Sequence, residues 1–200
     1  MKPDWNKKYE QAGFFYGTEA AAFLHEQVEH LVPGASALAV ADGEGRNSVF
    51  MAAQGQEVVA LDSSAVGMEK AKALASERGV SVDYRLADMR NWEWEEEEYD
   101  VVAAIFIQFA EPGFRDALFE GMKRTLKPGG ILLLHGYTPK QVEFGTGGPP
   151  CGDNMYTTEL LQNAFSDMEV LRLQAYEREL DEGPGHSGMS ALIDLVARKV

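Results

Sequence analysis

A short turn with two glycines and two carboxylates has residue types and a spacing that suit ligand binding. Residues 37–41 are a run of small apolar side chains, which favours a buried parallel strand. Asp42-Gly43-Glu44-Gly45 follows, and a helix is expected over residues 48–54. The glycines allow a tight turn and let a ligand approach the backbone. A strand, a glycine turn and a helix in this order indicate a nucleotide-binding α/β unit.

The charge of this turn bears on the ligand that it accepts. The third glycine of a dinucleotide-binding fingerprint would fall at Ser48 and is absent. A pyrophosphate at a helix N-terminus also favours amides without negative charge nearby, whereas Asp42 and Glu44 are acidic. The two carboxylates suit a ligand with an ammonium or a sulfonium group, and S-adenosylmethionine has both.

A third acidic residue stands at the distance expected for a ribose contact. Asp62 follows the second predicted strand, residues 57–61, and lies roughly 20 positions after Gly43. In this class of fold such a residue accepts hydrogen bonds from ribose hydroxyls. Asp62 could instead cap the next helix, a role that Ser63 or Ser64 fills equally well. We favour the ribose contact because the glycine turn lies at the right distance.

Length and charge restrict the classes of partner. Two hundred residues suit one domain with a sizeable core, so we expect a single domain over residues 1–200. A net charge of −14 argues against nucleic acid and gives no attraction to anionic membranes. The lone Cys151 forms no internal disulfide, and the histidines lack paired metal-ligand spacing, so no metal is expected. Without an apolar run of signal-peptide or transmembrane type, we expect a cytoplasmic monomer or weak dimer.

The rest of the chain alternates predicted strands and helices. Strands are expected at residues 82–86, 99–107, 131–134, 168–179 and 190–198, and helices at 65–78, 112–126 and 157–165. Residues 37–200 would form this α/β core, and residues 1–36 an N-terminal flap with a helix over 18–31. The aromatic residues of this lead-in suit core packing, although Tyr16 beside Gly17 also suits a flap over a ligand.

In combination, these motifs resemble a class I S-adenosylmethionine-dependent methyltransferase. The motifs stand in the expected order and cover nearly the whole chain: Asp42-Gly43-Glu44-Gly45, Asp62, Ala87-Asp88-Met89 and Leu126-Lys127-Pro128-Gly129-Gly130. Two further segments look most like the branch around tellurite-resistance and thiopurine methyltransferases: Glu44-Gly45-Arg46-Asn47 and Phe15-Tyr16-Gly17-Thr18-Glu19. The resemblance implies a Rossmann-like seven-stranded sheet in the order 3-2-1-4-5-7-6, with strand 7 antiparallel and helices on both faces.

The resemblance also implies a cofactor site. Asp62 would hold the ribose of S-adenosylmethionine, Asp88 would meet the adenine amino group, and the Met89 backbone would lie beside the ring. The glycines of the turn would approach the methionine part, with Gln108 near the reaction centre. The cofactor-binding residues predicted in this way are Tyr16, Asp42, Gly43, Gly45, Asn47, Asp62, Ser63, Asp88, Met89 and Gln108.

Two positions depart from the family pattern. Ala39 stands inside the first strand, where the family usually has an acidic residue that helps to hold the cofactor. Ala20-Ala21 stands where close relatives often have Pro-Asn. The first departure puts the strength of cofactor binding in doubt.

Topology indicates where a methyl acceptor would bind. Ligands of a parallel sheet bind beyond the carboxyl ends of its strands, so the turn that carries His186 should face the pocket. Tyr137 leaves the fifth strand on the same edge. We therefore predict that both residues line the acceptor pocket as catalytic residues, with His186 as a base or an acceptor-orienting group. The alternative for His186 is a solvated side chain in a glycine-rich turn.

The sequence therefore favours methyl transfer from S-adenosylmethionine to a small molecule, with S-adenosylhomocysteine as product. A nicotinamide-dependent oxidoreductase is a second hypothesis, against which the missing glycine and the carboxylates of the turn argue. A cofactor-binding or regulatory protein without enzyme activity is a third, and Ala39 keeps it open.

Overall fold

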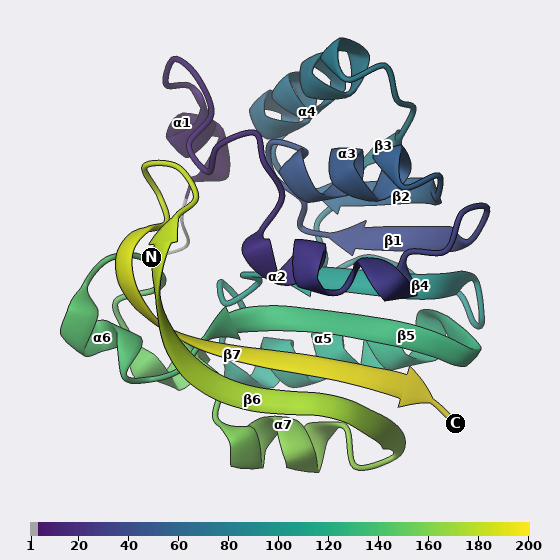
Figure 1. Cartoon of the computed structure of the whole chain (residues 1–200), viewed down its shortest axis with the longest axis vertical. Helices are drawn as coiled ribbons and strands as arrows, with labels where there is room; N and C mark the ends of the chain where they lie inside the picture. Colours follow the sequence, from purple (N-terminus) through teal and green to yellow (C-terminus); the bar gives the residue numbers. More distant parts are fainter. Residues whose placement is uncertain (1–3) are drawn as a thin grey trace.

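One sheet of seven strands, in the order β3-β2-β1-β4-β5-β7-β6, organises the chain in a computed structural model that describes residues 4–200 (Figure 1). β7 pairs antiparallel with β5 and β6, and the other neighbouring strands pair parallel. The predicted strand order and the predicted antiparallel seventh strand are therefore confirmed.

The strands are β1 Ser36–Val40, β2 Glu57–Asp62, β3 Asp83–Leu86, β4 Tyr99–Ile105, β5 Leu126–Tyr137, β6 Met168–Asp181 and β7 Ser187–Lys199. The helices are α1 Trp5–Tyr9, α2 Ala22–Glu26, α3 Arg46–Ala53, α4 Ala65–Glu77, α5 Pro112–Thr125, α6 Gln141–Phe144 and α7 Thr158–Ala164. Short 3-10 turns lie at η1 Val28–His30 and η2 Gly152–Asn154.

Alternate side chains of the central strands enter two cores, one on each face of the sheet. From β1, Leu38 and Val40 join a core that includes residues of α5 and α7. Ala37 and Ala39 join the other core, with residues of α2 and α3. The side chain at Ala39 is 2% exposed and belongs to this second core, so this position contributes packing. A strand buried on both faces explains the continuous apolar run in the sequence.

The N-terminal segment differs from its prediction. A helix over residues 18–31 was expected, but α2 covers only Ala22–Glu26 and a 3-10 turn follows. The amides of Ala21 and Ala22 donate to the side chains of Asn47 and Glu182, at 3.0 and 2.9 Å. These bonds to distant residues hold the chain extended before α2, so Thr18 does not cap a helix.

Two further differences lie in segments for which neither a helix nor a strand was predicted, residues 5–9 and 127–130. Helix α1 was not predicted; its N-cap is Asp4, whose side chain accepts a hydrogen bond from the Lys7 amide at 3.1 Å. Strand β5 begins at Leu126 and not at the expected residue 131, so residues 127–130 lie within a strand whose pairing with β4 shifts register.

Gly45 is required by packing as well as by conformation. Its φ of +93° is in the left-handed region, and a Cβ there would lie 2.6 Å from the Ala71 Cβ of α4. Glycine thus lets the start of α3 approach α4. Gly79 also has a positive φ, +68°, but a Cβ there would meet nothing within 4 Å.

We therefore expect Gly45→Ala to lower the free energy of unfolding by about 1–3 kcal/mol more than Gly79→Ala, because only the first adds overpacking to backbone strain. Urea denaturation of both variants measures the difference. Equal losses would show that conformation alone requires glycine at Gly45.

Candidate functional site

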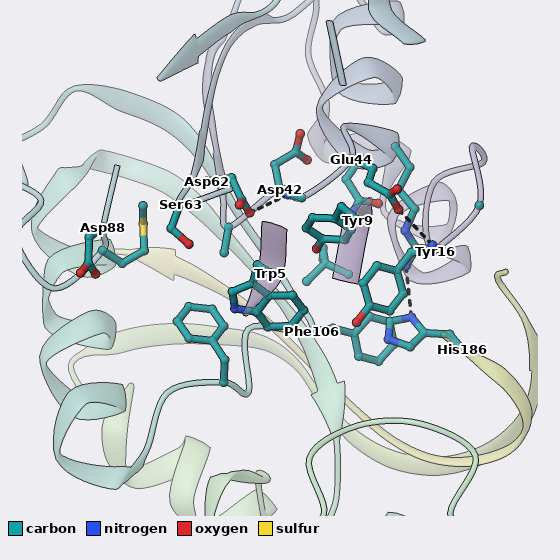
Figure 2. Close-up of a pocket in the computed structure, with 18 of the residues that line it drawn as sticks. Trp5, Tyr9, Tyr16, Asp42, Glu44, Asp62, Ser63, Asp88, Phe106 and His186 are labelled. Atoms are coloured by element: carbon teal, nitrogen blue, oxygen red, sulfur yellow. Dashed lines mark hydrogen bonds between the residues drawn. The ribbon is translucent and has the colours of Figure 1, made fainter. Parts of the chain in front are cut away.

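A cavity of about 200 Å³ lies at the carboxyl ends of the parallel strands, beneath the N-terminal segment (Figure 2). The predicted residues that line it are Tyr16, Asp42, Gly43, Asn47, Asp62, Ser63, Asp88, Met89 and His186. Its aromatic lining comes from Trp5, Tyr9, Tyr16, Phe106, Phe109 and Phe114. The cavity therefore lies at the predicted edge of the sheet.

Asp62 ties the glycine turn to the start of α4. One carboxylate oxygen accepts a hydrogen bond from the Gly43 amide at 2.8 Å, and the other accepts from the Ser64 amide at 2.7 Å. Burial raises the pKa of this carboxyl group. The cap of α4 is Ser64, whose hydroxyl accepts from the Gly67 amide at 3.0 Å. Asp62 is thus free of the capping role, and its ribose contact stays a prediction.

Asp42 is a half-buried carboxylate with local partners. It accepts hydrogen bonds from the Ser48 amide, at 3.1 Å, and from the Ser48 hydroxyl. Burial is the main cause that raises the pKa of Asp42 to about 6, against the opposing effect of the Ser48 hydrogen bonds. The residue before it, Ala41, has a φ of +51°, which is strained for alanine. Strain and buried charge therefore meet at the wall of the cavity, as they often do at functional sites.

Glu44 holds the N-terminal segment. Its side chain accepts from the amides of Phe15 and Tyr16, at 2.7 and 3.3 Å, and pairs with Lys70 at 2.9 Å. The residue is only 3% exposed. Its carboxylate is therefore already neutralised within the protein, and the sequence argument that Glu44 provides charge for a cationic ligand is corrected by these contacts.

The aromatic residues of the lead-in serve both packing and the cavity. Asn6 of α1 accepts hydrogen bonds from the Ser64 hydroxyl and the Val66 amide, at 2.8 and 3.3 Å, which docks α1 on the start of α4. Tyr9 is 4% exposed, and a Cβ on Gly43 would lie only 2.7 Å from its hydroxyl oxygen. Tyr9 therefore covers the glycine turn.

His186 is buried at the other end of the cavity. Its ring centroid lies 4.0 Å from that of Phe106 and 4.4 Å from that of Tyr16 (Figure 2). Its Nδ1 is 3.5 Å from a guanidinium nitrogen of Arg46. Burial first, and then the positive charge of Arg46, hold the pKa of His186 well below its usual range. The structure thus places this side chain in the cavity wall and not in solvent.

Three predicted residues do not line the cavity. Gly45 packs against α4 as described above. Tyr137 is 1% exposed and lies behind Phe106 and His186, at centroid distances of 4.8 and 5.8 Å. The amide group of Gln108 is bonded to the backbone of Tyr137, through two hydrogen bonds of 2.7 Å. The predictions that Tyr137 faces an acceptor and that Gln108 lies at the reaction centre are therefore corrected.

Sequence reasoning missed several lining residues. The position of Arg46 could have indicated a functional role, because a cation in the first turn of a helix interacts unfavourably with the helix dipole. Phe106 lines the cavity with a φ of +56°, a strained conformation for a bulky residue that no sequence pattern indicates. Trp5 and Tyr9 lie on α1, which was not predicted.

The half-buried carboxyl group of Asp42 should lower stability at neutral pH. Its pKa is about 6 in the folded protein and about 3.9 in an unfolded chain, so the folded state gains a proton, and stability, as the pH falls from about 8 to about 5. We expect Asp42→Asn to be more stable than the wild type by about 1–2 kcal/mol near pH 8, with the advantage shrinking toward pH 5. Urea denaturation at several pH values checks this, and a constant difference would contradict it.

Comparison with known proteins agrees with this architecture. Residues 37–130 match a family model described as a methyltransferase domain. A probable thiol methyltransferase 2 of Arabidopsis thaliana is 26% identical over 195 residues, which cover 94% of this chain and 82% of that protein. The chain spans 57% of the length of uncharacterised mycobacterial relatives that it matches at 28% identity.

Solved structures share the fold. An S-adenosylmethionine-dependent methyltransferase of Methanosarcina mazei superposes with a TM-score of 0.72 at 16% identity, over 91% of this chain and 99% of that one. TehB of Haemophilus influenzae superposes with a TM-score of 0.72 at 18% identity, over 98% of this chain and 66% of that one. Among residues 4–200, no helix combines the length and apolar character needed to cross a membrane. Residues 37–130 are therefore similar to a methyltransferase domain, and the chain has the fold of solved S-adenosylmethionine-dependent methyltransferases, which is the fold that its motifs indicated.

Proposed function

We propose that this protein transfers a methyl group from S-adenosylmethionine to a small-molecule acceptor. The observation that carries the proposal is the division of the cavity into a polar end and an aromatic end. Asp62, Ser63 and Asp88 lie at one end, where β2 and β3 finish (Figure 2). Tyr16, Phe106 and His186 enclose the other.

The polar end fits the cofactor by its chemistry. The carboxylates of Asp62 and Asp88 are acceptors, which suit ribose hydroxyls and an adenine amino group. Met89 is 6% exposed and offers an apolar contact beside them. The backbone of Gly43 brings no side chain into the space, and the aromatic lining suits a cationic sulfur by its ring faces. When bound, S-adenosylmethionine supplies an activated methyl group on that sulfur.

The aromatic end fits a nucleophile that needs no base. Alignment of two bound reactants is worth about 7–11 kcal/mol, and rings that exclude water help to hold it. The groups near His186 are donors: the guanidinium of Arg46 and a neutral imidazole. Such a site favours an acceptor that arrives already ionised. Together with the name of the Arabidopsis relative, this supports a small thiol, bound as its thiolate, as the acceptor.

Cofactor binding tests the first part of the proposal. Titration calorimetry should show that S-adenosylhomocysteine binds and that NAD does not. Asp62→Ala should weaken the binding of S-adenosylhomocysteine by about 1.5–3 kcal/mol, because hydrogen bonds to a charged group are lost. The matched control is Asp100→Ala, which removes a carboxylate bonded to the Ser36 amide at the start of β1, the opposite edge of the sheet. Equal binding by Asp62→Ala and the wild type would remove Asp62 from the site.

Methyl transfer tests the second part. Incubation with labelled S-adenosylmethionine and a panel of thiols, amines and phenols should label the thiols. Labelling of another class would replace the thiol assignment, and binding of S-adenosylhomocysteine without labelling of any acceptor would favour a cofactor-binding protein without enzyme activity.

A further inference from the structure

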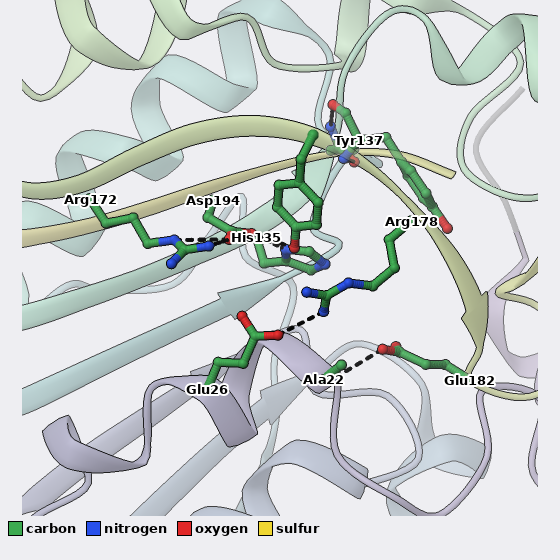
Figure 3. Close-up of polar contacts among 10 residues, drawn as sticks. Ala22, Glu26, His135, Tyr137, Arg172, Arg178, Glu182 and Asp194 are labelled. Carbon is green, nitrogen blue, oxygen red and sulfur yellow. Dashed lines mark hydrogen bonds and ion pairs between the residues drawn. The ribbon is translucent and has the colours of Figure 1, made fainter. Parts of the chain in front are cut away.

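A buried arginine joins the start of α3 to the turn between β6 and β7. Arg46 Nη1 lies 2.9 Å from Glu182 Oε2, with side chains only 6% and 10% exposed. Arg46 Nη2 lies 3.5 Å from His186 Nδ1. The other carboxylate oxygen of Glu182 accepts from the Ala22 amide at 2.9 Å (Figure 3). The cost of desolvating a buried ion pair offsets much of its electrostatic attraction. This pair is therefore expected to contribute less to stability than to the position of the side chains around it.

The contact with Arg46 determines where the hydrogen of His186 lies. A guanidinium has only donors and keeps its charge. The Nδ1 of His186 is therefore the acceptor, and the neutral ring carries its hydrogen on Nε2. Among residues 4–200, Nε2 has no hydrogen-bond partner. This atom is accessible, and the ring that carries it lines the cavity.

The turn that carries the ring is itself fixed. The Glu182 amide donates to the His186 carbonyl at 2.9 Å, and the His186 amide donates to the Gly183 carbonyl at 3.0 Å. The Gly185 amide donates to the Phe15 carbonyl at 2.9 Å. With Phe106 and Tyr16 on its faces, the ring has little freedom to rotate.

The charges around the ring agree with a neutral state. Burial, Arg46, His135 and Lys8 all oppose a proton on His186 and lower its pKa. The carboxylate of Glu182 is paired with Arg46, and burial raises the pKa of the neighbouring tyrosines above their usual range. The titratable and charged groups that face the ring are Lys8 of α1, Tyr16, Arg46 of α3, His135 and Tyr137 of β5, and Glu182.

We propose that Arg46 and Glu182 are positioning residues that fix His186 as a hydrogen-bond donor at Nε2, directed at the methyl acceptor. The identity of the ligand rests on the proposed function, whereas the position of the hydrogen does not. His186 then orients a lone pair of the acceptor and does not remove a proton, so of the two roles predicted for it the orienting one is kept. The acceptor has to lose its proton before it enters the site.

The direct test is nitrogen NMR of protein labelled with 15N-histidine. Wild-type His186 should stay neutral between about pH 5.5 and about pH 8, with its hydrogen on Nε2. The variant Arg46→Met/Glu182→Gln removes both charges, so neither is left buried without its partner. In this variant we expect both tautomers, and a pKa that is higher than in the wild type but still below the ordinary value of histidine, because burial, the larger cause, remains.

A second arginine–glutamate pair provides the matched control. Arg178 of β6 lies 2.7 Å from Glu26 of α2 (Figure 3), and neither residue is among the groups that lower the pKa of His186. Arg178→Met/Glu26→Gln should therefore leave the His186 signals unchanged. It should also keep kcat/KM for the acceptor within about twofold, whereas Arg46→Met/Glu182→Gln should lose about tenfold or more.

The outcomes separate the two proposals. A wild-type His186 that titrates near pH 6.5, or that carries its hydrogen on Nδ1, overturns the inference whether or not methyl transfer occurs. The expected tautomer in a protein that binds no S-adenosylhomocysteine supports the role of Arg46 and Glu182 and overturns the proposed function.

Discussion

The polar side chains at the start of α3 bind segments that are far apart in the sequence. Glu44 accepts two amides of the lead-in at Phe15 and Tyr16, and Asn47 accepts a third at Ala21. Arg46 holds Glu182, which in turn accepts the next amide, at Ala22. Each hydrogen bond to a buried charge contributes about 1.5–3 kcal/mol, so together they decide whether the lead-in covers the sheet edge. Figure 1 shows α1 and the β6–β7 turn gathered at that edge.

The cavity depends on this arrangement because its walls come from those segments. Tyr16 belongs to the lead-in and His186 to the β6–β7 turn, and neither lies on a parallel strand. The sheet contributes the floor, from the ends of β1, β2 and β4. The costly features gather here too: positive φ at Ala41 and Phe106, and a carboxyl group with a raised pKa at Asp42. The two cores on either side of the sheet supply the stability that tolerates them.

The fold and the proposed cofactor-binding end of the cavity could be predicted from the sequence for physical reasons. Apolar runs, glycine turns and the ends of strands are local patterns, and a parallel sheet brings its carboxyl ends to one edge, which is why Asp62 was placed at the cavity. Asp88 and Met89 were placed there by the family resemblance, and both line the cavity. Gln108 was misplaced because its side chain binds the backbone of Tyr137, a contact that spacing does not encode.

The acceptor end was less accessible because long-range side-chain contacts decide it. Residues 18–21 have the pattern of a helix. They stay outside α2 because the amides of Ala21 and Ala22 donate to the distant side chains of Asn47 and Glu182. Tyr137 does leave β5 at the predicted edge, but it is buried against Phe106 and His186, which line the cavity in its place. Arg46 was overlooked although its place at a helix start is electrostatically unfavourable.

The central claim is that the carboxylate of Glu44 closes the lead-in over a cofactor-binding cavity. Hydrogen exchange of the wild type and Glu44→Ala, each with and without saturating S-adenosylhomocysteine, tests it most directly. We predict that the ligand slows exchange at residues 10–22 of the wild type. We also predict that Glu44→Ala exchanges faster at Phe15 and Tyr16 than the wild type, keeps protection in β4 and β5, and binds the ligand more weakly. Equal exchange of residues 10–22 with and without ligand, or full affinity in Glu44→Ala, would contradict it.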